Sequence, residues 1–430
     1  MSNLSIADDR IFELESKLEK SRLKVHDLAT MGTLIASILD IETILSVVME
    51  MSIRMVEGEV GLIQLFENNE LKSKVTWGID DTIVKNIRYR DNQDISDYCY
   101  SKQESAIYND FKKDGGAGPN IDSVLAIPIR SRARCHGTVV IINNTGGTNF
   151  GEQDKENLEM LVNFAAVAID NSILLKESLD KQRIEQELSI ARQVQNVILP
   201  ENEIQIDGVE FGTFYRSAKE VGGDFYDVIR LNDSEFLVLI GDVSNKGVPA
   251  ALVMSATVAI IKSELRHNPA ISPSQLISNL NNLLCDGIIK SHEMFVTLFI
   301  ARFNLKEGKV IYCNAGHVPP LCWHTEQNAV IELRTGGTFV GQFPGFEYSE
   351  GEKSINKGDR LFAFTDGLTE AEDINGNFFG IDRVRQVFSA KKELPADKFC
   401  LVVKEWVDRF REGAGSETVD DFTLFEVKIL

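Results

Sequence analysis

Apolar residues near the start of the chain recur at the spacing of a coiled-coil seam. The rest of this stretch is highly charged, so nothing else in it can bury these side chains. We therefore predict a short parallel coiled coil over residues 1–32 in preference to a solvated amphipathic helix, and Gly32 ends the pattern. The seam positions, spaced 3, 4, 3, 4 and 3, are Ile11, Leu14, Leu18, Ser21, Val25 and Leu28.

Residues 33–175 alternate strand and helix patterns, which indicates an α/β domain. Strands are predicted at 60–66, 72–77, 123–129 and 137–143. A helix follows, and no Gly or Pro interrupts the chain from Glu152 to Leu199. Its later part carries an imperfect seam that includes Glu177, Lys181 and Gln195, so residues 176–199 are predicted to be a helical signalling connector.

After Pro200 the pattern changes to strands, turns and two buried helices. The stretch "EVGGDFYDV" opens a predicted hairpin whose turn is Asn232, Asp233 and Ser234. A turn centred on Asp233 places Asp224 opposite Asp242, with Cβ atoms about 4.5–5.5 Å apart. Two carboxylates that close repel each other unless one is protonated or a cation lies between them. Asp227 is three residues from Asp224, faces the other side of the strand and is expected to be structural.

Two further aspartates stand at strand ends. Asp366 closes the apolar strand Leu361–Phe364, and Asp420 precedes the strand in "DDFTLFEVKIL". An antiparallel arrangement would bring all four carboxylates to one sheet edge. Such a cluster needs a divalent cation, and an all-oxygen shell favours Mg²⁺ or Mn²⁺. Each Asp–Gly pair taken singly is more often structural, and structural Ca²⁺ stays an alternative, although no DxDxDG loop occurs.

The composition narrows the class of protein. The chain has 430 residues, 43% hydrophobic and 26% charged, which indicates a globular protein of two or three domains. A formal net charge of −20 argues against a nucleic-acid partner. No run of eighteen apolar residues and no signal-like N-terminus is present, so neither membrane insertion nor secretion is expected. The 6 cysteines form no CxxC pair, which fits reduced thiols in the cytoplasm.

Two resemblances add to this picture. The run "SVLAIPIRSRARCHGTVVIINNTGGTNFGEQDKENLEMLVNFAAVAIDNSILL" resembles the C-terminal half of a GAF domain, a small α/β sensor module, and the likeness covers roughly residues 36 to 175. It implies an unidentified small-molecule or protein signal. Cys135 and His136 are a possible ligand pair, although Cys135 is expected to be an ordinary hairpin residue.

From about Ile190 onward the chain resembles the SpoIIE/RsbU branch of the PPM (type 2C) metal-dependent protein serine/threonine phosphatases. The motifs, in order, are "AKEVGGDFYD", "GDVSNKGVPAALVMS", "MFVTLFIARFN", "NAGHVPPL", "FTDGLTEA", "FFGIDRV" and "DDFTLFEV". The resemblance implies an αββα sandwich over residues 200–430, two Mn²⁺ or Mg²⁺ ions and direct attack on phosphate by an activated water. It implies metal-binding and catalytic roles for Asp224, Asp242, Asp366 and Asp420, a metal-binding role for the Val243 carbonyl, and Asp421 as second choice.

The general acid stays unassigned, because Asp242-Val243-Ser244 stands where some relatives place a histidine. Lys219 could contact phosphate or be an exposed strand residue, and His317 could act in catalysis or support a turn. The resemblance further implies a phosphorylated STAS-type substrate in bacterial partner switching, acted on by a cytoplasmic homodimer. The alternative is a catalytically inactive, ligand-sensing binding protein that regulates a partner, and a ligand-gated nucleotide cyclase is weaker still because no cyclase motif is present.

Overall fold

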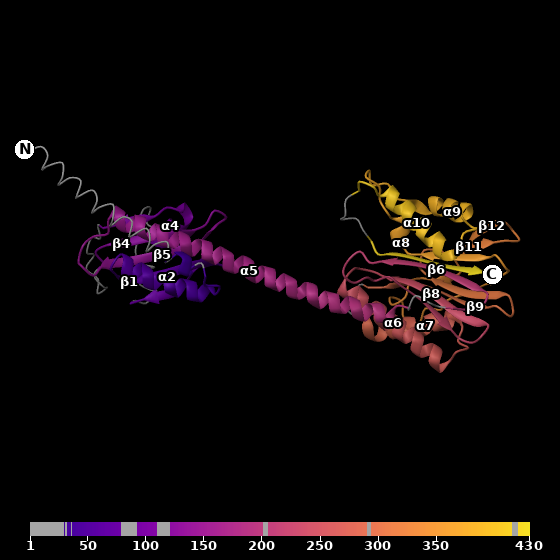
Figure 1. Ribbon diagram of the computed structural model, residues 1–430. Helices are drawn as coiled ribbons and strands as arrows, with labels where there is room; N and C mark the ends of the chain where they lie inside the picture. Colours follow the sequence, from indigo (N-terminus) through magenta and orange to yellow (C-terminus); the bar gives the residue numbers. More distant parts are fainter. Residues whose placement is uncertain are drawn as a thin grey trace, which may run out of the picture. The chain divides into compact units, whose positions relative to one another are not determined.

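The computed structural model divides into two compact units, Met1–Arg183 and Ile184–Leu430 (Figure 1). The coiled coil predicted at the N-terminus falls almost entirely outside the described residues, and Gly32, at its end, is itself helical. The residues that the structure describes are 30, 32–35, 37–78, 93–109, 121–200, 205–289, 294–414 and 420–430.

The N-terminal unit is built on one antiparallel sheet. Its described strands follow the order β2-β1-β5-β4-β3. The four strands predicted from the sequence are present as β1, β2, β4 and β5. The element bounds are α2 Ile41–Met55, β1 Gly58–Glu67, β2 Glu70–Trp77, α4 Ile95–Lys102, β3 Ala106–Tyr108, β4 Val124–Arg130, β5 Cys135–Asn144 and α5 Glu152–Ile198.

Helices cover both faces of this sheet, and the alternation of side chains along β5 shows how. Val139 and Ile141 pack into the core that α2 and α5 share. Val140 and Ile142 point the other way and pack against α4. Both faces of the strand are therefore buried, which is why β5 reads as a nearly continuous apolar run.

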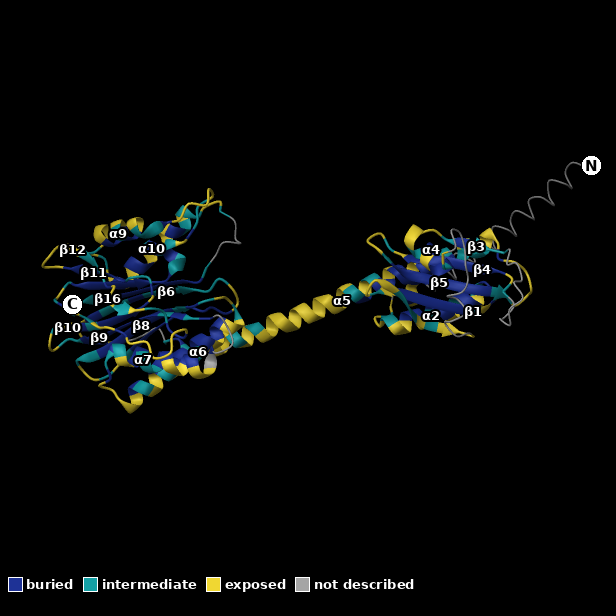
Figure 2. Ribbon diagram, turned by 180° about the vertical axis from the view of Figure 1, so that it is seen from behind, coloured by how far each residue is buried: buried dark blue, intermediate teal, exposed yellow. Residues whose placement is uncertain are grey.

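Helix α5 is continuous over 47 residues, as the absence of Gly and Pro predicted. Its first part packs in the core of the N-terminal unit through residues such as Leu161 and Ile169. Every residue from 174 to 187 is exposed, as the yellow stretch of α5 in Figure 2 shows. Helices α5 and α6 (Val248–His267) are both long and apolar enough to cross a membrane by length and composition, a test that buried core helices also pass. The apolar side of α6 packs into the core of the C-terminal unit.

The C-terminal unit contains two sheets in which most of the strand pairs are antiparallel. Among the described residues one sheet has six strands, in the order β13-β10-β9-β8-β7 with β14 beside β10, and the other has five, in the order β12-β11-β15-β16-β6. The strand bounds are β6 Val209–Arg216, β7 Phe225–Arg230, β8 Glu235–Val243, β9 Val296–Asn304, β10 Lys309–Ala315, β11 Leu321–His324, β12 Ala329–Glu332, β13 Gly336–Gly337, β14 Gly351–Ser354, β15 Arg360–Phe364 and β16 Phe422–Ile429.

The sheets stack face to face between helical layers (Figure 1). Apolar side chains of both sheets, such as Val238 and Phe425, fill the space between them. Helices α6 and α7 cover the outer face of the six-stranded sheet, and α9 and α10 cover the outer face of the five-stranded sheet. This is the predicted αββα sandwich. The remaining helical bounds are α7 Pro273–Leu283, the π-helical turn η2 Leu284–Ile288, α8 Asp366–Thr369, α9 Gly380–Ala390 and α10 Ala396–Phe410.

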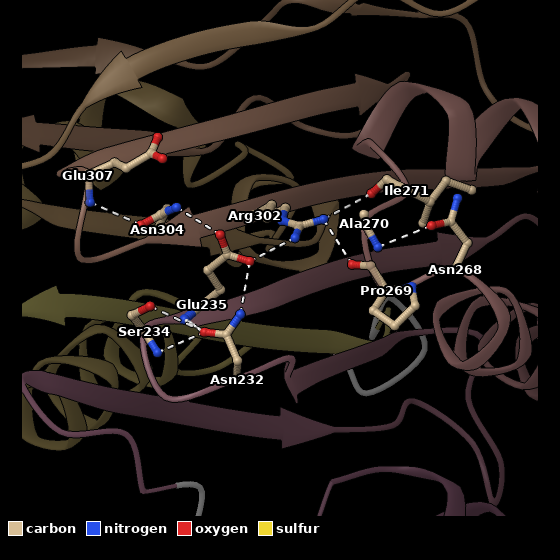
Figure 3. Close-up of polar contacts among 10 residues, drawn as sticks. All are labelled: Asn232, Ser234, Glu235, Asn268, Pro269, Ala270, Ile271, Arg302, Asn304 and Glu307. Carbon is tan, nitrogen blue, oxygen red and sulfur yellow. Dashed lines mark hydrogen bonds and ion pairs between the residues drawn. The ribbon is translucent and has the colours of Figure 1, made fainter.

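The β7–β8 hairpin is fixed at its turn by side-chain hydrogen bonds (Figure 3). Asn232 Oδ1 accepts from the backbone N–H of Ser234 and of Glu235, each at 2.9 Å. The Glu235 carboxylate accepts from Asn304 and from Arg302, each at 2.7 Å. The Arg302 guanidinium, the largest cause, holds the pKa of Glu235 below its usual value. The turn, β9 and the loop after α6 are thereby joined, because Arg302 also donates to the carbonyls of 269 and 271. This anchors the hairpin at the end away from Asp242.

Candidate metal centre

The hairpin places Asp224 opposite Asp242, as the sequence predicted. Phe225 pairs with Gly241, and the same register continues along the whole hairpin. Asp224 precedes the first paired residue and therefore lies opposite Asp242, which pairs on its other side with Thr297 of β9. The register follows from the three-residue turn, since a slip of one residue would turn every side chain to the other face.

Asp366 and Asp420 come from the other sheet, so the expectation of a single sheet edge was wrong. Asp366 begins α8 directly after β15, and Asp420 precedes β16. Strands β15 and β16 pair antiparallel, with Phe364 opposite Leu424, inside the five-stranded sheet. The four acids therefore stand at the ends of two stacked sheets. Alternating polarity predicts which residues end a strand, whereas the choice of sheet depends on pairing between distant strands.

Two threonines of the five-stranded sheet hold Asp224. Its Oδ2 atom accepts hydrogen bonds from Thr365 Oγ1 and Thr423 Oγ1, each at 2.6 Å. Asp224 itself is 1% exposed. These two hydroxyl groups were not singled out by sequence reasoning. They stand directly before Asp366 and three residues after Asp420, at the strand ends where the acids had already been found. The contacts fix one carboxylate of the first sheet against the second.

Three of the carboxyl groups, those of Asp224, Asp242 and Asp366, have raised pKa values. Burial first, and then the charges of Asp242 and Asp421, raise the pKa of Asp224 well above its usual value. Burial, followed by the charges of Asp366 and Asp420, raises the pKa of Asp242 to about 7. For Asp366 the same order of causes, burial and then Asp420, raises the pKa to about 6. A cluster of this kind needs protons or a cation for compensation.

The chemistry of these donors fits a divalent cation. Asp224 Oδ1 is buried and receives no hydrogen bond from any described residue, although the Asp242 carboxyl lies against Asp224. The Val243 carbonyl oxygen lies 2.8 Å from where a Cβ would stand on Gly223, so it faces the segment beside Asp224. Lys246 Nζ lies 3.0 Å from Asp420 Oδ1. Within the described part of the chain, no three His, Cys, Asp or Glu side chains are arranged to hold a metal as they stand.

Asp421 has a different role from that of its neighbour. Its Oδ1 accepts from the Ala218 N–H at 2.7 Å and its Oδ2 from the Gly223 N–H at 2.6 Å. Its carboxylate therefore holds the segment that leads to Asp224. Asp227 is turned to the α6 side, where its Oδ2 lies 2.7 Å from Lys262 Nζ, which agrees with the structural role expected for it.

The end of α5 holds the same segment from the other side. Gln195 is 4% exposed, and its Nε2 donates to the Gly222 carbonyl at 2.7 Å. Its Oε1 accepts from the Gly222 N–H at 3.3 Å, so one side-chain amide pairs with both groups of one residue. Arg192 donates to the carbonyls of Lys219 (3.0 Å) and Glu220. Sequence reasoning placed Gln195 on a helical seam but did not predict this contact. A polar residue at a seam position was the feature of the sequence that could have indicated it.

Two candidates left open in the sequence are now located. His317 is buried, and its Nδ1 lies 3.0 Å from Thr297 Oγ1, which in turn donates to the Asp242 carbonyl at 3.4 Å. Burial lowers the pKa of His317 to about 4, so the ring is neutral and supports the strand end. Lys219 is exposed, and its carbonyl is the group that Arg192 binds.

The comparisons with known proteins agree with this geometry. The family model described as Stage II sporulation protein E (SpoIIE) matches residues 232–430, and a GAF domain model matches residues 38–170. The phosphoserine phosphatase RsbU of Bacillus subtilis is 32% identical over 250 residues, which cover 58% of this chain and 71% of RsbU. The phosphoserine phosphatase RsbP of the same organism is 23% identical over 192 residues, 44% of this chain and 47% of RsbP.

A solved structure shows the same fold. The SiaA-PP2C domain of Pseudomonas aeruginosa superposes with a TM-score of 0.52 at 18% sequence identity, covering 58% of this chain and 99% of that domain. The two stacked sheets with their helical layers, the family model and the identity to RsbU therefore agree. The chain belongs to the SpoIIE/RsbU family of PP2C-type protein serine/threonine phosphatases and carries an N-terminal GAF domain.

Proposed function

We propose that this phosphatase removes phosphate from phosphoserine or phosphothreonine on a STAS-type protein of a bacterial partner-switching system. The main support for a catalytic site is the convergence of four carboxylates from two sheets, with raised pKa values at Asp224, Asp242 and Asp366. The substrate class rests on the likeness to RsbU and RsbP, both named phosphoserine phosphatases. A cytoplasmic location accompanies this proposal.

The residues that would hold two Mn²⁺ or Mg²⁺ ions are Asp224, Asp242, Asp366, Asp420 and the Val243 carbonyl. When bound, such ions polarise a phosphoryl group and supply a nucleophilic water. Thr365 and Thr423 fix the Asp224 carboxylate through Oδ2 and leave its buried Oδ1 without a hydrogen bond from any described residue. Burial makes the charged forms of Asp242 and Asp366 unfavourable unless a cation lies beside them. A bound divalent cation would therefore favour the ionised forms of both carboxyl groups.

The connector is proposed to carry the sensor state to this site through the end of α5. Gln195 and Arg192 bind the segment 219–223 at Gly222 and Lys219, and Asp421 binds it at Gly223. A rotation or shift of α5 would move this segment and, with it, Asp224. Inserting four residues after Lys181 rotates the helix face and is expected to change both basal and stimulated activity. If neither changed, this route of coupling would be refuted.

The protein is proposed to act as a homodimer. Ile190, Val194 and Val197 are spaced 4 and 3 along α5 and are 56%, 59% and 85% exposed, which leaves a short apolar stripe next to the Gln195 contact. The heptad pattern at residues 11–28 supports the same proposal from the sequence. Sedimentation of the full chain tests it, with a shift toward monomer expected for Val194→Glu.

The rival is a catalytically inactive, ligand-sensing protein. A complete acid set disfavours it. The test is Mn²⁺-dependent hydrolysis of p-nitrophenyl phosphate by the full chain, with Asp242→Asn as the inactive control and Asp233→Asn, a fully exposed turn aspartate, as the matched active control. Absence of metal-dependent turnover in wild type would favour the rival. A second arm compares a phosphorylated STAS protein with an unrelated phosphoprotein, and equal rates on both would refute the substrate assignment alone.

A further inference from the structure

The N-terminal unit contains a cavity that the phosphatase chemistry does not use. It has a volume of about 550 Å³, within the range of small-molecule sites. It lies at the end of the sheet where β1 finishes and β5 begins, between the start of α2 and the middle of α5. All of its lining residues are described and belong to the sensor unit.

The walls of this cavity are largely apolar. Leu45 and Ile169 are buried side chains of α2 and α5 that line it, and Ile173 follows one turn later on α5. Phe66 and Tyr100 stack on each other with ring centroids 4.5 Å apart and an interplanar angle of 18°. Phe66 is 40% exposed and borders the cavity. An apolar molecule with a flat ring matches such walls.

One polar group is built into the wall. The His136 side chain is 6% exposed, and its Nε2 lies 2.8 Å from Asp170 Oδ1 on α5. A break in the β4–β5 register between Ile129 and Arg130 accompanies its turn toward the helix. Burial, the largest cause, lowers the pKa of His136 and favours the neutral ring. The Asp170 carboxylate beside Nε2 favours the tautomer that carries the proton on Nε2. Nδ1 is then an acceptor, and no described residue donates to it.

The charged groups at the rim are already compensated. Lys74 Nζ lies 2.7 Å from Glu67 Oε1, and Arg134 Nε lies 3.7 Å from Asp170 Oδ1. Glu42 is the remaining charged lining residue and is exposed at the first turn of α2. The cavity thus has apolar walls and one hydrogen-bond acceptor that no described residue uses. Because the charges at its rim are largely paired, it favours a neutral ligand over an ion.

We propose that this cavity binds a small neutral molecule with a flat apolar body and a single N–H or O–H group that donates to His136 Nδ1. This inference rests on the proposed sensor function and adds to it the site where the signal binds and the chemical class of the ligand. Such a ligand touches α5 at Ile169 and Ile173, immediately before the exposed stretch that begins at residue 174. Binding is measured directly, so its failure is distinguishable from a failure of the phosphatase assignment.

Indole and benzothiophene are suitable probes, because they share a shape and only indole carries an N–H donor. The full chain labelled at isoleucine methyls is titrated with each and followed by NMR. Indole is expected to shift the methyls of Ile41, Ile169 and Ile173 saturably. Benzothiophene is expected to bind about tenfold more weakly, since it leaves the buried acceptor unpaired. Equal affinities, or shifts that do not saturate, would overturn the proposal.

Variants test whether the preference for indole over benzothiophene depends on His136 Nδ1. His136→Leu is expected to abolish the difference between the probes, whereas His267→Leu, at an exposed histidine of the other unit, is expected to retain it. Ile173→Phe narrows the cavity at a half-buried position and is expected to weaken both probes equally, with Ile41 and Ile169 as reporters. A preference for indole that survives in His136→Leu, or unchanged binding in Ile173→Phe, would contradict the assignment.

Discussion

Gln195→Ala is the most direct perturbation of the contact between α5 and the segment that leads to the proposed metal centre. The substitution removes the hydrogen bonds of one side-chain amide to both backbone groups of Gly222, at 2.7 and 3.3 Å. Alanine is a better helix former than glutamine, so α5 itself is not weakened. The expected consequence is a segment 219–223 that no longer holds its position beside Asp224.

The magnitude follows from burial. Gln195 is 4% exposed, so Gly222 loses its partners in a place that water reaches poorly. A net hydrogen bond contributes about 1 kcal/mol, and an unpaired buried group costs about 1–3 kcal/mol. The two contacts together hold the segment by about 2–4 kcal/mol. Since about 1.4 kcal/mol is a factor of ten, the population of the competent segment falls by about thirtyfold to about seven hundredfold.

The assay is Mn²⁺-dependent hydrolysis of p-nitrophenyl phosphate, with kcat, KM and the apparent Mn²⁺ affinity measured separately. The matched control is Gln193→Ala, an exposed glutamine two residues earlier on the same helix. Circular dichroism at the assay temperature confirms that both variants are folded. A lower kcat with weaker Mn²⁺ affinity in Gln195→Ala alone is the expected result.

Two results would refute the reasoning. If Gln195→Ala matched wild type in kcat and in Mn²⁺ affinity, Gln195 would not position the segment beside Asp224. If Gln193→Ala lost as much activity, the effect would belong to the helix as a whole and not to the buried amide pair.

Three further predictions concern the same domain. Gly222→Ala is expected to abolish activity, because a Cβ would stand 2.6 Å from Tyr215 Oη, whereas Gly287→Ala, with nothing within 4 Å, is expected to retain it in the same assay. In EDTA, thermal stability is expected to fall as pH rises from 3.8 toward about 7. Asp242 has a higher pKa in the folded protein than in the unfolded chain, and this difference stabilises the fold at low pH. The contribution is full below the pKa of the unfolded chain and is lost as pH rises through the pKa of the folded protein. Saturating Mn²⁺ or Asp242→Asn should flatten that slope in melting curves, and an unchanged slope would contradict the electrostatic argument. Arg360→Met is expected to cost about 3–5 kcal/mol in urea unfolding by leaving Glu426 buried without its partner. The two side chains are 1% and 0% exposed and lie 2.6 Å apart, and a double variant with Glu426→Leu should recover most of the loss; an additive double variant would count against this.

Local pattern was sufficient to predict several elements. The hairpin register came from a three-residue turn and a strand period of two, which together leave one pairing that buries the apolar face. The continuity of α5 came from 47 residues without Gly or Pro. The strands and their terminal acids were found in the same way, because an aspartate next to an apolar run marks a strand end wherever the strand lies.

The partners of these residues could not be obtained in this way. A period of 3.6 places Gln195 on a face of α5, but it does not say that the face meets Gly222, 27 residues further on. Asp420 and Asp421 are neighbours with the same side chain, and in the structure the approach of the 218–223 segment distinguishes their contacts. That approach turns Asp421 into an acceptor for two backbone N–H groups.

The sequence by itself determined the strands and helices, the hairpin that sets Asp224 opposite Asp242, and the acidic residues of the candidate site, because these depend on local geometry and side-chain chemistry. The tertiary structure alone decided that the acids come from two stacked sheets, that Thr365 and Thr423 hold Asp224, and that α5 ends on Gly222. The reason is physical: hydrogen bonds and burial between distant segments depend on which surfaces meet, and periodicity reports only which surface a residue occupies.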